Sequence, residues 1–289
     1  MKANRTVATA TLPTALLVSR NSTDAPTTEA PAGDAGQSLR VLAERAGVRI
    51  GTTVDMAAFD ADATYRSHVA REFSTITAEN VMKWESTEPE RGVHDWAAAD
   101  RLVDFADRHR LAVRGHTLVW HNQNPAWLAE GDFSSQELRQ ILRQHIFDEV
   151  GHFKGRIWHW DVVNEAFDDE GELRDSIWLR KLGPGYLADA FRWAHEADPA
   201  ARLYLNDYNA EGINPKSDAC YHLVRQLRAD RVPVHGFGMQ GHLGVQYGFP
   251  DDVRHNLRRF GSLGLETAFT EVDVRMPMPA DATKLQAQA

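Results

Sequence analysis

The chain alternates strand-like apolar runs with helix-like segments, and most of the apolar runs end in polar or aromatic side chains. The run that leads into His116 continues to Trp120 and Gln123, and the run that leads into Asn206 continues to Tyr208. Alternating units of this size predict a parallel sheet. Parallel strands of a βα barrel bring their carboxyl ends to one face, where such barrels hold their active sites. We therefore expect these polar groups to form one site.

The apolar runs predict seven strands, which begin near residues 48, 73, 111, 157, 202, 236 and 265. Helices are predicted over residues 38–46, 96–109, 186–196 and 216–229. A further helix should begin after Ser134, because Ser134 and Glu137 have the spacing of a capping box ahead of the apolar Leu138. The length of 289 residues suits one large domain, since βα barrels commonly have about 250 residues or more.

The first 37 residues differ from the rest of the chain. Lys2 and Arg5 precede a mildly apolar stretch from Val7 to Val18, which is typical of a weak export signal and predicts a secreted protein. Residues 21–36 are rich in Thr, Pro, Ala and Asp, which predicts a disordered linker. The folded domain is expected to span residues 38–289.

Charge and composition exclude several classes of partner. A formal net charge of −9 argues against nucleic acid, whose phosphates require a basic patch. No apolar run approaches the roughly 20 residues that span a bilayer, so we expect no membrane partner. Cys220 is the one cysteine, so an internal disulfide is impossible, and its place in a helix-like stretch favours packing over a nucleophilic role. We expect a monomer.

Two glutamates close strand-like runs about a hundred residues apart. Glu165 follows the run 157–163, and Glu271 follows the run 265–270. A single glutamate at a strand end is usually a solvated loop residue. Two carboxyl groups at the ends of strands that face each other across a barrel can instead share acid/base chemistry on one substrate.

Five segments resemble the endo-1,4-β-xylanases of glycoside hydrolase family ten: residues 76–85, 114–121, 160–166, 205–209 and 270–273. They occur in the family's order, and the resemblance extends from about residue 45 to residue 276. It implies an α/β fold of the TIM (β/α)8 type. It also implies hydrolysis of internal β-1,4-xylosidic bonds in xylan and xylo-oligosaccharides by retaining double displacement.

By this resemblance Glu165 is the general acid/base and Glu271 the nucleophile. Asn164 is implied to hydrogen-bond a sugar hydroxyl beside the scissile bond, although a strand-end amide can also cap the next turn. His242 is implied to donate to Glu271 while Asp273 orients its ring, which keeps Glu271 ionised. A histidine that only satisfies a buried carboxylate is the alternative for His242.

Further residues match the family's substrate-binding positions. Xylan is neutral, so its recognition depends on hydrogen bonds to hydroxyl groups and on flat aromatic surfaces. The predicted substrate-binding residues are Glu79, Asn80, Lys83, Trp84, His116, Trp120, Gln123, Asn206, Tyr208 and Gln240.

The chain departs from the family after the seventh strand. The family's barrel has eight strands, yet only residues 277–289 follow Met276, too few for a helix, a strand and a closing helix. We therefore expect a barrel that lacks its eighth βα unit, with the strands near residues 48 and 265 as its open edges. The activity of such a chain is left open.

Two alternatives belong to other functional classes. One is a non-catalytic or weakly active xylan-binding barrel fragment, in which the two glutamates are not held well enough to cut. The other is a metal-dependent hydrolase, for which His116, His121, His242, Asp207 and Glu165 are candidate ligands. The first strand lacks the His-x-His pair that metal-dependent barrel hydrolases commonly carry. We expect neither a metal nor a cofactor.

Overall fold

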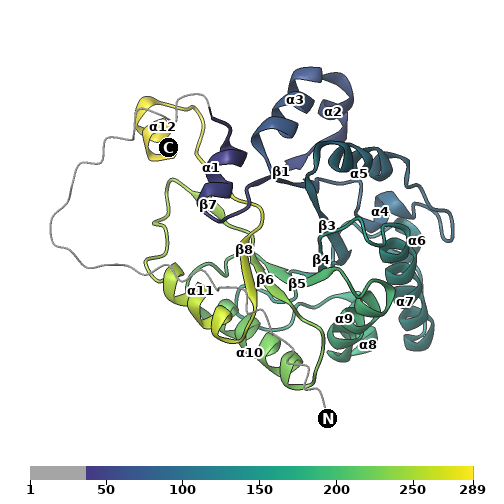
Figure 1. Ribbon diagram of the computed structural model, residues 1–289. Coiled ribbons are helices and arrows are strands. Elements are labelled where there is room, and N and C mark those ends of the chain that lie inside the picture. The colour runs from purple at the N-terminus through teal and green to yellow at the C-terminus, as the bar shows by residue number, and fades with distance from the viewer. Residues whose placement is uncertain (1–36, 289) are drawn as a thin grey trace, which may run out of the picture.

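The computed structural model describes residues 37–288, which form a curved parallel sheet with helices on its outer face (Figure 1). The sheet strands are β1 (Gly51–Val54), β2 (Thr75–Ala78), β3 (Ala112–Val119), β4 (His159–Asn164), β5 (Arg202–Asp207), β6 (Gly236–Met239) and β8 (Glu266–Phe269). Their order in space is their order in the chain, and all neighbours are parallel. All seven predicted strands and the barrel type of fold are confirmed.

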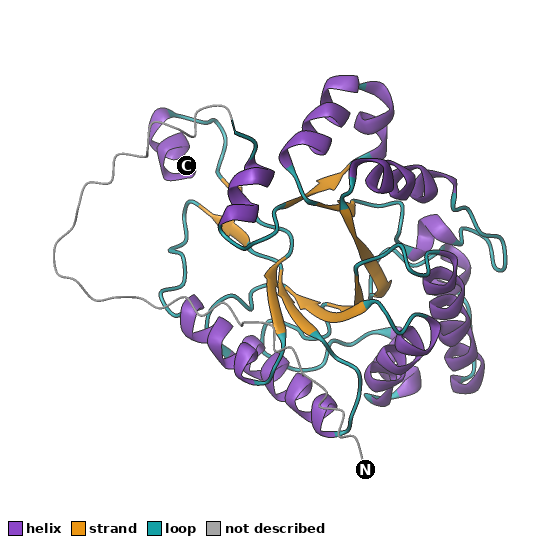
Figure 2. Ribbon diagram, viewed as in Figure 1, coloured by secondary structure: helices purple, strands orange, loops and turns teal. Residues whose placement is uncertain are grey.

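The five predicted helices are α1 (Leu39–Arg45), α5 (Ala97–His109), α7 (Ser135–His152), α9 (Gly185–Ala197) and α10 (Pro215–Ala229). Figure 2 shows them around the outside of the strands. The capping box that was predicted for α7 is present, since the Ser134 hydroxyl accepts from the backbone of Glu137 and the Glu137 carboxylate accepts from the backbone of Ser134. Asn214 and Ser217 cap α10 in the same reciprocal way.

Seven helices were not predicted: α2 (Met56–Ala61), α3 (Ala63–Glu72), α4 (Trp84–Thr87), α6 (Ala126–Ala129), α8 (Ile177–Leu182), α11 (Val253–Ser262) and α12 (Ala282–Gln288). Most of them are too short to show a helical period. In α11 the buried face consists of Val253, Asn256 and Phe260, and the polar asparagine interrupts its apolar pattern. Asn256 is buried because its amide donates to three backbone carbonyls of the loop that precedes α10.

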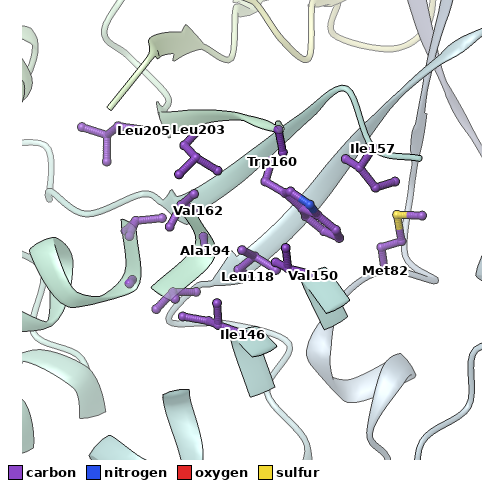
Figure 3. Packing of buried hydrophobic residues seen from close by; sticks show 14 of the residues in the cluster. Met82, Leu118, Ile146, Val150, Ile157, Trp160, Val162, Ala194, Leu203 and Leu205 are labelled. Carbon is purple, nitrogen blue, oxygen red and sulfur yellow. The ribbon is translucent and has the colours of Figure 1, made fainter. Parts of the chain in front are cut away.

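The core lies between the sheet and its helices. Trp160 of β4 is fully buried and packs near Leu118 and Val150 (Figure 3). A side chain on Gly115 of the neighbouring β3 would collide with the Trp160 ring, so only glycine fits beside it. Cys220 is also fully buried in α10, as the packing interpretation predicted.

The described sheet has two open edges, as expected. β1 bonds only to β2, and β8 bonds only to β6. While β4 and β6 are buried along their whole length, β8 is partly exposed, and 39% of the Phe269 surface is accessible. β8 is therefore hydrogen-bonded to one neighbouring strand within the described sheet. Its position depends more on side-chain contacts from inside the barrel than the position of a central strand does.

A small parallel pair, β7 (His242–Gly244) with β9 (Asp273–Arg275), was not predicted. Its register places His242 directly beside Asp273. The predicted export signal and most of the linker lie outside the described residues. Within the described residues, no helix has both the length and the apolar character needed to cross a membrane.

Candidate active site

The two glutamates lie at the carboxyl ends of their strands. Glu165 directly follows β4, and Glu271 lies two residues beyond β8. Glu165 has a φ of 55°, a left-handed conformation that is uncommon for residues other than glycine and is often found at functional sites. The side chains of Glu165 and Glu271 retain 15% and 21% of their exposure, so both carboxylates are accessible from the mouth of the barrel.

Three buried amides connect the two glutamates. The Asn206 amide donates to Oε1 of Glu271 and to Oδ1 of Asn164, at 2.8 Å in each case. The Gln240 amide donates to the same Asn164 oxygen and to Oε1 of Glu165, at 3.2 Å in each case. The amide of Asn164 itself lies 3.5 Å from Glu165 Oε1. These contacts hold the carboxylates of β4 and β8 as one unit, because each amide is fixed by more than one partner.

The glycine of β6 makes room for this network. A Cβ atom on Gly238 would collide with the Asn206 side-chain oxygen, which accepts a 2.7 Å hydrogen bond from the Thr270 hydroxyl. With that oxygen occupied, the amide nitrogen of Asn206 points to Asn164 and Glu271. Gly238 therefore contributes to the site by its lack of a side chain.

His242 and Asp273 surround the other oxygen of Glu271. Nδ1 of His242 lies 2.8 Å from Asp273, and its Nε2 lies 3.5 Å from Oε2 of Glu271. The interaction with Glu271 raises the pKa of His242, while burial opposes the rise and Asp273 adds to it. Burial would raise the pKa of Glu271, but His242, His116 and Arg114 together hold that pKa well below its usual range. Glu271 is thus ionised at neutral pH.

Beneath Glu271 lies a buried charge cluster that sequence reasoning missed. Arg114 of β3 donates to Asp161 of β4, and Asp161 also contacts Nδ1 of His116 at 2.8 Å. His116 Nδ1 is in turn 3.9 Å from Glu271. The available signal was a pair of opposite charges, Arg114 and Asp161, inside two predicted strands, since strand interiors rarely bury charges unless they are paired.

One side of the site holds half of the predicted sugar-binding residues. The side-chain oxygen Oδ1 of Asn80 accepts hydrogen bonds from Lys83 at 3.3 Å and from Gln123 at 3.2 Å. The Lys83 ammonium lies 5.2 Å from the centre of the Trp120 ring. Gln123 also donates to Glu85 at 2.8 Å. The structure brings these residues together on the loops after β2 and β3. Glu79 directly follows β2, at the same face of the sheet, and its side chain is exposed.

The other side is built around Tyr208. Its hydroxyl accepts a 3.0 Å hydrogen bond from Arg174, which also donates to the backbone oxygen of Glu165. The Lys216 ammonium lies 3.1 Å from the centre of the Tyr208 ring and 2.9 Å from Asp207. Sequence reasoning missed both supporting cations, because they come from a loop and from the first turn of α10, outside the strand ends. They fix the plane of the Tyr208 ring beside Glu165.

His121 is a further neighbour of Glu165, with Nδ1 at 3.8 Å from Oε2. It had been considered only as a possible metal ligand. Burial lowers the pKa of His121, and the cation of Arg174 adds to the decrease. His121 is therefore a neutral ring at neutral pH and places no positive charge beside Glu165.

The structure corrects three of the predicted substrate contacts. Trp84 is only 3% exposed and stacks between the rings of His145 and Trp178, so its assignment to the substrate site is wrong. Asn206 is completely buried and holds Glu271 rather than a sugar. Gln240 is 2% exposed, and its amide is already occupied by Asn164 and Glu165. Both amides position the glutamates.

The two tryptophans provide a direct test of this correction. Trp84→Ala is expected to lower the free energy of unfolding by about 3–5 kcal/mol, as large-to-small core changes do. Trp120→Ala should leave stability nearly unchanged and raise KM for xylan about tenfold, which corresponds to the loss of one aromatic contact. Urea unfolding and steady-state kinetics of both variants are the measurements. A large KM change for Trp84→Ala at unchanged stability would restore it to the substrate site.

The candidate metal ligands have other partners. Asp207 pairs with Lys216, His242 with Asp273, and His116 with Asp161. Among residues 37–288, no three His, Cys, Asp or Glu side chains form a group that could hold a metal ion. The arrangement instead offers one carboxylate held in its ionised form, Glu271, and a second carboxyl group, Glu165, which is contacted by the amides of Asn164 and Gln240.

Comparison with known proteins places this site in a family. The sequence profile described as "Glycosyl hydrolase family 10" matches residues 38–289. The chain is 44% identical over 246 residues to an endo-1,4-beta-xylanase B of Thermotoga neapolitana, a match that covers 83% of this chain and 70% of that protein. It is 41% identical over 253 residues to an endo-1,4-beta-xylanase of Agaricus bisporus, covering 86% of this chain and 75% of that protein.

Solved structures agree with these relatives. Xylanase 10B from Thermotoga petrophila RKU-1, determined in complex with xylobiose, superposes with a TM-score of 0.84 at 42% identity. The match covers 86% of this chain and 77% of that one. A GH10 xylanase from Bispora sp. MEY-1, also with xylobiose, matches with a TM-score of 0.83 at 32% identity, covering 87% of this chain and 79% of that one.

Proposed function

Because the chain belongs to glycosyl hydrolase family 10, we propose that it is an endo-1,4-β-xylanase in which Glu271 is the nucleophile and Glu165 the general acid/base. The reaction is the hydrolysis of internal β-1,4-xylosidic bonds with retention of configuration. The observation that carries this proposal is the amide network, which joins the two carboxylates at the ends of β4 and β8 in one site.

In the first step Glu271 attacks the anomeric carbon while Glu165 gives its proton to the glycosidic oxygen. The bond from the anomeric carbon to the leaving sugar breaks as the bond to the Glu271 carboxylate forms. In the second step Glu165, now ionised, takes a proton from water, and the resulting hydroxide displaces Glu271 from the anomeric carbon. The enzyme returns to its starting protonation state.

The environments of the two glutamates support this division of roles. A nucleophile must be ionised, and Glu271 is surrounded by His242, His116 and Arg114, which lower its pKa. Within residues 37–288, Glu165 has no such cluster of cations around its carboxyl group, which is contacted by the amides of Asn164 and Gln240, and we assign it the proton transfer. Two carboxyl groups in different environments are the usual basis for separate acid and nucleophile roles.

The polar groups at the mouth suit a neutral polysaccharide. On one side, Asn80, Lys83 and Gln123 offer donors and acceptors beside the Trp120 ring. On the other side, Tyr208 offers a ring held from behind by Lys216. Xylan and xylo-oligosaccharides would lie between these two surfaces, with the scissile bond over Glu165 and Glu271. Solved relatives that carry xylobiose in their titles support this substrate class.

The stereochemistry of the first product tests the mechanism. Each of the two displacements inverts the anomeric carbon, so the released sugar should have the β configuration before it mutarotates. Proton NMR of the earliest product of xylo-oligosaccharide hydrolysis gives the answer. Early α-anomer would exclude the double displacement and the role of Glu271 as a covalent nucleophile.

Hydrolysis and binding must be measured together. The purified chain should release short xylo-oligosaccharides from soluble xylan, and a chelator should leave the rate unchanged. Retention on insoluble xylan without release of reducing sugar would instead identify the non-catalytic binder. Monomeric state and secretion stay predictions, which sedimentation and fractionation of a culture can test.

A further inference from the structure

The strand that carries the nucleophile has one bonded neighbour in the described sheet. β8 pairs with β6, and its other edge has no strand beside it among residues 37–288. Its residues are exposed or half-buried, in contrast to the buried β4, β5 and β6. Backbone hydrogen bonds on one side alone restrain a strand weakly, so Glu271 depends on contacts made from within the barrel.

One side chain reaches β8 from the opposite wall. Arg114 lies on β3, four strands away in the sheet order, and is only 4% exposed. Its Nη1 donates to the backbone oxygen of Thr270 at 2.9 Å, and its Nη2 lies 3.5 Å from Oε1 of Glu271. The Thr270 oxygen belongs to the peptide group that joins Thr270 to Glu271. Arg114 therefore contacts both the backbone and the carboxylate of the nucleophile.

Arg114 is itself anchored. Its Nη2 donates to Asp161, which is fully buried on β4 and also contacts His116 at 2.8 Å. The planar guanidinium group presents its donors in a fixed fork, so an anchor at Asp161 sets the direction of the other N–H groups. A lysine could supply the charge but not this fork.

Other charged groups also face Glu271. His116 from β3 lies 3.9 Å away, and His242 from β7 lies 3.5 Å away with Asp273 of β9 behind it. Lys83, from the loop after β2, also interacts with Glu271 through its charge. Arg114 differs from these neighbours because it is bonded to the backbone of the β8 segment as well.

We propose that Arg114 is a positioning residue of the nucleophile, in addition to the amide of Asn206, and that it ties Glu271 across the barrel interior to Asp161 and so holds it at a fixed distance from Glu165. This inference rests on the proposed roles of Glu271 and Glu165. Arg114 does not contact the substrate. Its effect is exerted through the backbone at Thr270 and through the charge next to the Glu271 carboxylate.

Two substitutions separate the backbone contact from the charge. Arg114→Met removes both, and Arg114→Lys retains a positive charge but loses the fork. We expect kcat on aryl β-xylosides to fall about 100-fold in both variants, the cost of an ångström-scale misplacement of a reacting group, with KM changed less than threefold. The matched control is Arg156→Met, since Arg156 bonds two carboxylates, Asp104 and Asp107, on the outer surface. That control should keep the full kcat.

The pH profile gives a readout that a merely structural role would not move. The rate of the first step falls as pH decreases through the pKa of Glu271, because only the ionised form attacks. Arg114 stabilises the ionised form, so its loss raises that pKa, and the acid limb of kcat/KM moves to higher pH. We expect this shift in Arg114→Met, little shift in Arg114→Lys, and none in Arg156→Met.

The outcomes distinguish this inference from the proposed function. Unchanged kcat in folded Arg114→Met, or an acid limb that does not move, overturns the positioning role while Glu271 keeps its own. An effect on KM alone would make Arg114 a substrate-binding residue and also overturn it. If circular dichroism shows that Arg114→Met does not fold, the test rests on Arg114→Lys. That variant keeps the positive charge but loses the fork, so we expect a reduced kcat and no shift in the acid limb of its kcat/KM profile. Failure of the proposed function would appear separately, as activity that survives removal of the Glu271 carboxylate.

Discussion

Replacement of Glu271 by glycine is expected to abolish the hydrolysis of every xyloside, with a loss in kcat of about 10⁶-fold, the order found when a covalent nucleophile is removed. His242 and Arg114, which contact the Glu271 carboxylate, cannot act as the nucleophile in its absence, because both are cations or hydrogen-bond donors. The loss should be equal for substrates with good and poor leaving groups. Residual kcat on an activated aryl β-xyloside is the measurement.

An added nucleophile should restore the lost step in this variant. Azide can enter the space that the Glu271 side chain leaves and attack the anomeric carbon from the same face, which gives an α-xylosyl azide by a single inversion. The matched control is Glu266→Gly, because Glu266 is an exposed glutamate at the start of the same strand. Near-normal activity in Glu271→Gly, or a β-azide as its product, would contradict the nucleophile assignment.

Replacement of Glu165 by alanine is expected to reduce kcat/KM on xylan about 10²- to 10⁴-fold, the usual contribution of general acid catalysis. A dinitrophenyl β-xyloside should lose far less in kcat/KM, because its leaving group departs without a proton. For that substrate the second step becomes slow, since water has lost its base, and a covalent intermediate should accumulate as a burst of released phenol.

Azide also tests this variant, with the opposite stereochemistry. It needs no base, so it should accelerate release of the intermediate and give a β-xylosyl azide. The matched control is Glu170→Ala, since Glu170 is an exposed glutamate in the loop that follows Glu165. Equal losses on activated and natural substrates would remove Glu165 from the role of acid/base.

The sequence by itself determined the strands, the larger helices and the family. Apolar runs of strand length, separated by amphipathic segments, fixed β1 to β6 and β8, because these patterns arise from the local period of side chains along the chain. The capping box at Ser134 is equally local, since both partners lie within one helical turn. Glu165 and Glu271 were found because they close such runs inside segments that resemble the family's motifs.

Only the tertiary structure decided which polar strand-end residues face a sugar and which are buried. Trp84, Asn206 and Gln240 carry the same kinds of groups as Trp120 and Asn80, yet the first three are covered by other elements. Burial depends on what packs over a residue, and the elements that do so are distant in sequence. The contact from Arg114 to Thr270, across 156 residues, is of the same kind. No local period encodes it, because it exists only once the sheet has curved and brought β3 to face β8.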